Sequence, residues 1–373
     1  MQYHMPARLY FGPGEIQQVS TVLEAKNPVL VTDKGVVKAG LLEPVLDRLG
    51  KIPVFDTIEA NPKSDTINTI AAQLRQQKPD LVIGMGGGSP LDAGKALALL
   101  ATNPGNIQDY EGKEKYVTDP LPFMAIPTTC GTGSEVTWVS VITDVDRKFK
   151  MSIKGPKLYP AVSIVDPDLI VTLPKPMIAS TGMDALTHAV EAYLAKPATL
   201  ITDTHAVKAV GLILGSIEKA FADIQANVGH REDLMYGSMV AGLAFGNADV
   251  TAVHCISESI GALYDIPHGV ANAMFLPHVL DYNLPACTRK MAALARTTGI
   301  DAASDDQAAK IFIQKIKDLS KALQIPAFRD LNIGSDQFAL IAGMSFKNNS
   351  NASNPRDLGQ ADYLNILEAA LGA

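Results

Sequence analysis

The first half of the chain alternates short apolar runs, often β-branched, with segments whose apolar residues recur at helical spacing. The apolar runs predict strands at 28–33, 52–56, 80–86 and 123–128. Between them, amphipathic helices are predicted at 35–50, ending at Gly50, and at 64–77 and 90–101. Further β-rich pieces at 138–144, 149–153 and 161–166 close this half. Such alternation predicts a parallel sheet with helices on both faces.

From about Ile178 the pattern changes to long apolar-periodic segments with few β-branched clusters. They predict helices at 178–195, 199–224, 231–248, 251–264 and 308–323. A chain of 373 residues is long enough for two domains, possibly three. We therefore expect an α/β domain at 1–177, an all-helical domain at 178–373, and a cleft between them that suits a small molecule.

Composition narrows the class of protein. With 47% hydrophobic and 19% charged residues, the chain resembles an ordinary globular protein. The net charge of −7 and the dispersed basic residues predict no nucleic-acid partner. We expect no membrane span, because no run of about 18 apolar residues occurs. Three widely spaced cysteines and the lack of a signal-peptide pattern at the start favour a cytoplasmic location.

A glycine-rich turn, GMGGGSPLDAGK at 84–95, follows a predicted strand and opens a predicted helix. Backbone N–H groups there can approach a phosphate, although a tight turn without a ligand is the simpler alternative. The acidic residue that a dinucleotide site places about 20 residues later is missing. Asp33, at the end of the first strand, can hold the ribose if the sheet order puts that strand beside the turn. A carboxylate there favours NAD over NADP.

A second polar turn, IPTTCGTGSEVT at 126–137, also follows a strand. It offers the hydroxyls of Thr128, Thr129 and Thr132 to a cofactor. The alternative is a serine- and threonine-rich turn that caps a helix beginning at Ser134. The two interpretations are compatible.

Acids and histidines form two local pairs in the helical half. Asp184 and His188 lie four residues apart, on one face of a helix, and His254 and His268 follow later. A capping aspartate and buried, hydrogen-bonded histidines explain such pairs without a metal. Together, however, one carboxylate and three imidazoles are a plausible ligand set for Fe(II) or Zn(II). A metal beside a nicotinamide suggests hydride transfer to or from an alcohol or carbonyl.

These motifs, with TGMDALTHAVEAY at 181–193 and HCISESIGALYDIPHGVANAMFLPHV at 254–279, resemble the iron-containing (group III) alcohol dehydrogenases over essentially the whole chain. The resemblance implies a dinucleotide-binding domain, a helical domain, NAD, and Fe(II), or possibly Zn(II), bound by Asp184, His188, His254 and His268. It also implies a short alcohol, diol or aldehyde as substrate, and a homodimer or larger homo-oligomer. The candidate cofactor residues are Asp33, Asn61, Gly87, Gly88, Ser89, Asp92, Thr128, Thr129, Thr132 and Lys150.

One position departs from the family pattern. Many members carry a histidine one helical turn after the third ligand, near the substrate, where this chain has Glu258. A carboxylate can still relay protons, and we take Glu258 and His268 as the candidate catalytic residues. An outward-turned Glu258 with no role is the alternative.

Three other functions compete with this hypothesis. A glycerol dehydrogenase-like enzyme would have fewer metal histidines. A dehydroquinate synthase-like lyase also pairs NAD with a metal, but it needs clustered lysines and arginines, which 178–195 and 251–284 nearly lack. A non-catalytic sensor with the same fold is disfavoured by the intact ligand set.

Overall fold

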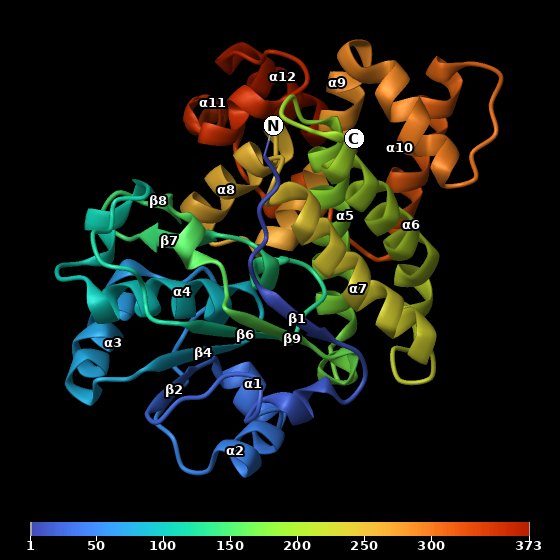
Figure 1. Ribbon diagram of the computed structural model, residues 1–373. Coiled ribbons are helices and arrows are strands. Elements are labelled where there is room, and N and C mark those ends of the chain that lie inside the picture. The colour runs from blue at the N-terminus through green and yellow to red at the C-terminus, as the bar shows by residue number, and fades with distance from the viewer. Residues whose placement is uncertain (1, 373) are drawn as a thin grey trace. The chain divides into compact units, whose positions relative to one another are not determined.

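A computed structural model describes residues 2–372 and divides the chain into two compact units (Figure 1). The first runs from His4 to Leu173, and the second begins at Pro174 and also includes Tyr3. The sequence pattern had placed the boundary at 177/178, close to this division.

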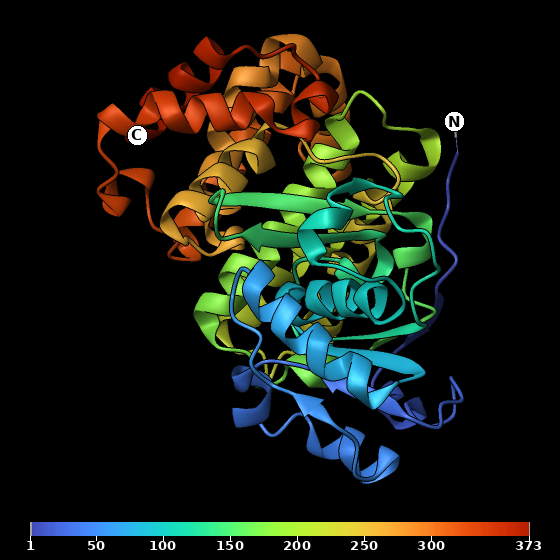
Figure 2. The same ribbon diagram turned by 90° about the vertical axis from the view of Figure 1, so that its left-hand side faces the viewer.

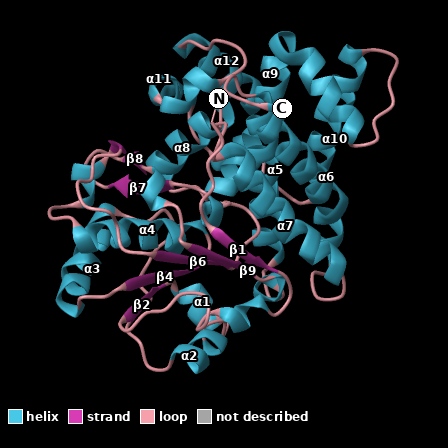
Figure 3. Ribbon diagram, in the orientation of Figure 1, coloured by secondary structure: helices cyan, strands magenta, loops and turns pink. Residues whose placement is uncertain are grey.

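A six-stranded, entirely parallel sheet forms the centre of the first unit (Figure 3). Its strand order is β1-β9-β6-β4-β2-β3, so β4 lies between β2 and β6. The predicted parallel α/β architecture is thereby confirmed. The sequence pattern missed β1. The strands are β1 (Arg8–Phe11), β2 (Pro28–Val31), β3 (Val54–Phe55), β4 (Leu81–Gly86), β6 (Phe123–Pro127) and β9 (Val162–Val165).

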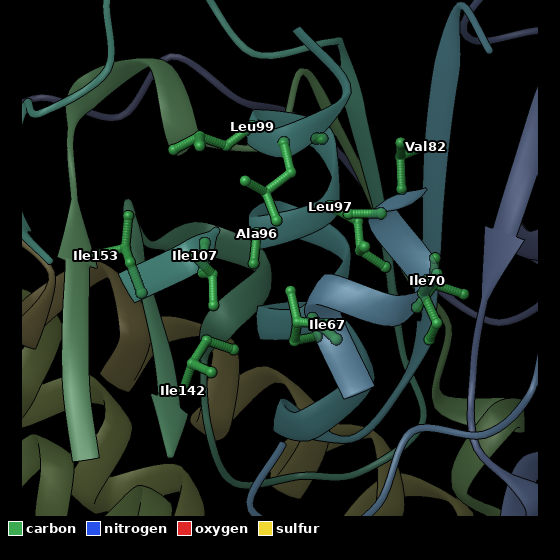
Figure 4. Packing of buried hydrophobic residues seen from close by; sticks show 14 of the residues in the cluster. Ile67, Ile70, Val82, Ala96, Leu97, Leu99, Ile107, Ile142 and Ile153 are labelled. Carbon is green, nitrogen blue, oxygen red and sulfur yellow. The ribbon is translucent and has the colours of Figure 1, made fainter. Parts of the chain in front are cut away.

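Helices cover both faces of this sheet because its central strands are apolar on both sides. On one face, α3 (Ser64–Gln77) and α4 (Gly88–Thr102) lie side by side (Figure 2). Their buried residues, among them Ile67, Ile70 and Leu97, belong to one core cluster with Val82 of β4 (Figure 4). A second core cluster, on the other face, includes residues of η1 (Glu15–Gln18), α1 (Lys34–Lys38) and α2 (Glu43–Leu49). Burying each such Leu, Ile or Val side chain contributes roughly 1.5–3 kcal/mol.

The helix predicted over 35–50 is wrong as a single element. The chain forms α1 and α2 instead, and Gly40 between them has a φ of 70°. This left-handed conformation ends a right-handed helix. Leu42 and Val45, whose apolar pattern suggested one continuous helix, are still buried.

A small second sheet completes the first unit. Its strands are β5 (Gly112–Lys113), β7 (Val139–Asp144) and β8 (Phe149–Lys154), in the order β5-β8-β7. The antiparallel β7–β8 hairpin corresponds to two of the predicted β-rich pieces. The segment expected to begin a helix at Ser134 forms only one 3₁₀ turn, η3 (Ser134–Val136). The remaining 3₁₀ turns of this unit are η2 (Ile107–Tyr110), η4 (Pro156–Leu158) and η5 (Pro167–Ile170).

The second unit contains helices and no strand within the described residues from 174 to 372, as predicted. Helix α5 (Lys175–Leu194) packs against α6, α7 and α9. Helix α9 bends at Cys287, two residues after Pro285, whose ring interrupts the helical hydrogen bonds. The other helices are α6 (Leu200–Ala222), α7 (Val228–Phe245), α8 (Ala252–Tyr264), α9 (His268–Thr297), α10 (Asp305–Ala322), α11 (Phe338–Lys347) and α12 (Gln360–Leu371), and the 3₁₀ turns are η6 (Phe328–Leu331), η7 (Ser335–Gln337) and η8 (Asn349–Ser353).

Helix α6 is, among residues 2–372, the one helix long and apolar enough to qualify as a candidate membrane span. Core helices of soluble proteins can have the same length and apolar composition, so these two properties alone are weak evidence for a membrane span. Ala206, Val210 and Ile213 of α6 are buried, and the helix packs against α5 and α7. One face of α6 is thus buried within the second unit.

Candidate metal centre and dinucleotide-binding residues

The carboxyl ends of three neighbouring strands bring together most of the predicted cofactor residues. Asp33 follows β2, Gly87 follows β4 and Thr128 follows β6, and β4 pairs with both other strands. The chain leaves β2 toward α1 on one face and β4 toward α4 on the other. Parallel α/β sheets bind ligands at such a switch point, outside the carboxyl ends of the strands.

A ribose contact by Asp33 requires its strand to lie beside the strand that leads into the glycine turn. This requirement is met, since β2 pairs with β4. Its Oδ1 accepts a hydrogen bond from the Val36 N–H at 2.9 Å, which caps α1. A Cβ atom built on Gly86 would lie 3.3 Å from Asp33 Oδ2. The carboxylate is therefore fixed at the edge of the turn. Its role in cofactor binding stays a prediction.

The glycine turn (84–95) and the threonine turn (126–137) pack closely together. A Cβ on Gly88 would lie 2.6 Å from Thr132 Cγ2, and one on Gly87 would lie 3.2 Å from Thr129 Cγ2. The Thr128 N–H also donates to the Gly86 carbonyl at 2.9 Å. Gly87 is the N-cap of α4, so the N–H groups of the first turn of that helix, including Ser89, are not all used within the helix. This arrangement fits a phosphate-binding turn.

Asn61 and Lys150 are far apart in sequence but meet in the structure. The Lys150 Nζ donates to Asn61 Oδ1 at 2.7 Å. Asn61 has a φ of 54°, a left-handed conformation that asparagine tolerates better than most residues. The amide and the amine thus hold each other in a defined position.

Asp92 and Lys95 tie α4 to the end of the threonine turn and to β7. The two side chains bind the hydroxyls and backbone of Ser134, Thr137, Val139 and Val141 over 2.6–3.3 Å. Burial lowers the pKa of the Lys95 amine to about 8, although Asp92 and Glu135 oppose the shift. Burial also raises the pKa of Glu135 to about 7. These contacts give Asp92 a structural role, and its cofactor role stays a prediction.

The four predicted metal ligands come together inside the helical unit. Asp184 and His188 lie on α5, His254 on α8, and His268 begins α9. One ligand atom from each lies within 4.8 Å of the others. Asp184 Oδ1 is 3.8 Å from His268 Nε2. Three of the residues are buried, and the side chain of His268 is partly exposed.

Close approach of α9 to α5 depends on Gly269. A Cβ there would lie 2.4 Å from the Ser180 carbonyl oxygen and 3.2 Å from Asp184 Cβ. Any other residue would push the start of α9 outward. Because His268 is the adjacent residue, the glycine brings its imidazole to the carboxylate.

The charges of the cluster suit a divalent cation. Burial alone would raise the pKa of the Asp184 carboxyl, but the facing histidines and the Asn272 amide hold it below its ordinary value. The His188 ring stacks on Phe245, with 4.2 Å between centroids, which fixes its plane. One carboxylate and three imidazoles match the donors that Fe(II) and Zn(II) prefer. The residues therefore fit the implied metal.

Two residues at this site were missed by the sequence analysis. Glu191 is buried on α5 and binds His254 Nδ1 at 2.5 Å. Asn272, on α9, places its Nδ2 2.6 Å from Asp184 Oδ1, and 3.0 and 3.1 Å from the Nε2 atoms of His254 and His268. Glu191 lies seven residues after Asp184, on the same helix face, and this spacing was the available signal.

Glu258 lies one turn after His254 on α8 and is partly buried. Its Oε2 accepts a hydrogen bond of 2.6 Å from Asn348 Nδ2. The side chain is thus anchored to the segment after α11. The hypothesis that it takes part in catalysis stays a prediction.

Known proteins resemble this chain along its whole length. Residues 6–167 match the family profile described as iron-containing alcohol dehydrogenase, and residues 178–371 match that of the C-terminal domain of the Fe-containing alcohol dehydrogenase family. A 1,3-propanediol dehydrogenase of Citrobacter freundii is 40% identical, covering 99% of this chain and 98% of that protein. The NAD-dependent methanol dehydrogenase of Bacillus methanolicus is 35% identical, covering 99% of each.

Solved structures agree with this result. A crystal structure of a 1,3-propanediol oxidoreductase superposes with a TM-score of 0.95 at 39% identity, covering 99% of both chains. The α/β unit, the helical unit and the enzyme class expected from the motifs are thereby confirmed. This chain belongs to the iron-containing alcohol dehydrogenase family and is an oxidoreductase that acts on alcohols.

Proposed function

We propose that the protein transfers hydride reversibly between NAD and a short alcohol, diol or aldehyde, with a divalent metal held by Asp184, His188, His254 and His268. The observation that carries the proposal is the convergence of these four donors within 4.8 Å. When bound, such a metal polarises the oxygen of the alcohol or carbonyl, and NAD accepts or supplies the hydride.

The side chains of the site have distinct tasks in this proposal. Asp184 supplies the negative charge of the ligand set, and the Asn272 amide, 2.6 Å from its Oδ1, holds that carboxylate in place. His268 serves as a ligand on the more exposed side, where a substrate can enter. We assign proton transfer to Glu258 Oε1, since Oε2 is bound by Asn348.

The first unit supplies the dinucleotide site. The glycine turn at Gly87, Gly88 and Ser89 binds the pyrophosphate, and Thr128, Thr129 and Thr132 line it. Asn61, Asp92 and Lys150 complete the proposed set. Asp33 binds the ribose hydroxyls and disfavours a 2′-phosphate, so NAD is preferred to NADP.

The identity of the metal, the cellular location and the oligomeric state are proposed from the family resemblance. We propose Fe(II) as the metal, with Zn(II) as the alternative, because both accept a ligand set of three nitrogens and one oxygen. We further propose that the protein is a cytoplasmic homodimer or larger homo-oligomer.

Metal content and turnover test the proposal together. The protein is purified anaerobically, its iron and zinc are quantified, and NADH oxidation is followed with a panel of short aldehydes before and after chelation. We expect about one metal per chain, loss of turnover on chelation, and recovery with Fe(II). Asp184→Asn should bind no metal, whereas Asp203→Asn, an acid on α6 outside the ligand set, should bind it normally. Turnover that survives complete chelation would contradict the metal's role.

A further inference from the structure

Glu191 uses both oxygens of its buried carboxylate on α8, the helix that carries His254. Its Oε2 binds His254 Nδ1 at 2.5 Å. Its Oε1 accepts hydrogen bonds from the Thr251 hydroxyl at 2.5 Å and from the Val253 N–H at 2.8 Å. Only 2% of the residue is exposed, so solvent offers no alternative partners.

The contact with Nδ1 determines which nitrogen of His254 can bind a metal. An ionised carboxylate accepts and cannot donate, so Nδ1 must carry the hydrogen. In the neutral imidazole, Nε2 then holds the lone pair. Nε2 of His254 lies near the other candidate metal ligands. It is 3.0 Å from Asn272 Nδ2, and the same amide nitrogen contacts Asp184 and His268. The tautomer fixed by Glu191 is therefore the one a metal requires.

The contacts of Oε1 place the start of α8. Thr251 is the N-cap residue, but its hydroxyl donates to Glu191 and does not cap its own helix. The Val253 N–H, one of the first in the helix, has Glu191 as its acceptor. A carboxylate from α5 thus replaces the usual cap, and its negative charge suits a helix N-terminus. His254 follows Val253 directly.

We propose that Glu191 is a positioning residue for the metal: it fixes the tautomer of His254 and, through the start of α8, the place of its ring. This proposal rests on the proposed metal site. A purely structural cap would need only an acceptor at Oε1, whereas this role requires acceptors at both oxygens. An amide cannot meet that requirement, because one of its two ends donates.

Glu191→Gln separates the two roles. If the new amide nitrogen faces His254, Nδ1 must accept, and Nε2 carries the hydrogen and cannot bind a metal. If the amide turns over, its nitrogen faces the Thr251 and Val253 donors. The Ala252 N–H has its own acceptor, Asn354 Oδ1 at 3.4 Å, so α8 keeps one cap in either case. Thr251→Val is the matched control, because it removes one donor to Oε1 and leaves the His254 contact intact.

The experiment measures Co(II) and Zn(II) affinity by chelator competition, the visible spectrum of bound Co(II), and the stability of the metal-free protein. We expect Glu191→Gln to weaken metal binding 10–100-fold and to change the Co(II) spectrum. Glu191→Asp should recover part of the affinity, and Thr251→Val should stay within about threefold of wild type while losing stability. Equal affinity and an unchanged spectrum in Glu191→Gln would overturn the proposal.

A second measurement uses the wild-type protein and does not depend on the folding of a variant. Long-range ¹H–¹⁵N spectra of the histidine-labelled, zinc-loaded protein identify the protonated nitrogen of each ring. We expect His254, assigned by its loss in His254→Gln, to be protonated at Nδ1. A proton at Nε2 would overturn the proposal. A wild-type protein that binds neither Co(II) nor Zn(II) would overturn the proposed function, and this proposal with it.

Discussion

The close approach of α9 to α5 depends on Gly269. Gly269→Ala would place a methyl group 2.4 Å from the Ser180 carbonyl oxygen, and backbone on both helices would have to move. We expect the free energy of unfolding to fall by about 1–3 kcal/mol, as for other overpacked sites. Metal affinity should fall as well, because His268 moves with the start of α9. Denaturant unfolding and chelator competition measure the two effects.

Gly211 provides the matched control for that substitution. It lies inside α6, and a Cβ there would meet nothing within 4 Å. Gly211→Ala should raise the free energy of unfolding by up to about 1 kcal/mol, because alanine favours the helix. If the two alanine variants behave alike, steric exclusion at Gly269 is not the reason for the glycine.

Glu135 gives the first unit a distinct dependence on pH. Burial raises the pKa of its carboxyl to about 7. Between the ordinary value of 4.5 and about 7, the folded state keeps a proton that the unfolded state has released. The free energy of unfolding therefore falls as pH rises through this window. The loss is roughly 3 kcal/mol at most. Lys95, with a pKa of about 8, titrates above the window.

Glu135→Gln removes this titration and leaves a neutral side chain of the same shape. We expect wild type to lose stability relative to the variant between pH 5 and pH 7, and the difference to level off above pH 7. Denaturant unfolding of both proteins at several pH values measures it. A difference that does not change with pH would show that Glu135 is ionised in the folded state throughout.

At the scale of elements, periodicity predicted most strands and helices, because buried strands and amphipathic helices leave strong patterns. It failed where a pattern continues across a backbone break. The apolar spacing over 35–50 persists on both sides of Gly40, although the backbone turns there. It also missed β1, a short strand at the edge of the sheet whose ends are exposed. Its residues, RLYF, include no β-branched side chain, and β-branched apolar runs were the pattern that indicated the other strands.

The four candidate metal ligands could be named from the sequence, and the residues that contact them could not. The chain has only seven histidines, so His188, His254 and His268 stand out in the sequence, and Asp184 lies one helical turn before the first of them. Glu191 and Asn272 belong to motifs already quoted, but their roles depend on how α5, α8 and α9 pack. Asp33 is intermediate: the proposed ribose contact requires a strand order that the sequence leaves open, and the β2–β4 pairing meets that requirement.

For the whole molecule, each unit carries its own candidate ligand site, and this leads to a separable pattern of stabilisation. A ligand that binds only the folded state stabilises it according to its concentration relative to its Kd. Asp184→Asn should abolish the rise in Tm caused by Zn(II) and keep the rise caused by NADH. Asp33→Ala should keep the Zn(II) effect, reduce the NADH effect, and increase the effect of NADPH, because the carboxylate no longer repels the 2′-phosphate.

Thermal unfolding of the three proteins, with each ligand at several concentrations, measures this pattern. The Zn(II) response of Asp33→Ala serves as the control for its fold, and the NADH response of Asp184→Asn does the same for the other variant. If Asp184→Asn also loses its NADH response, NADH binding requires the metal, and the two sites are not independent. If Asp33→Ala leaves the NADH and NADPH responses unchanged, Asp33 does not contact the ribose. Any preference for NAD must then come from other residues at the carboxyl ends of β4 and β6.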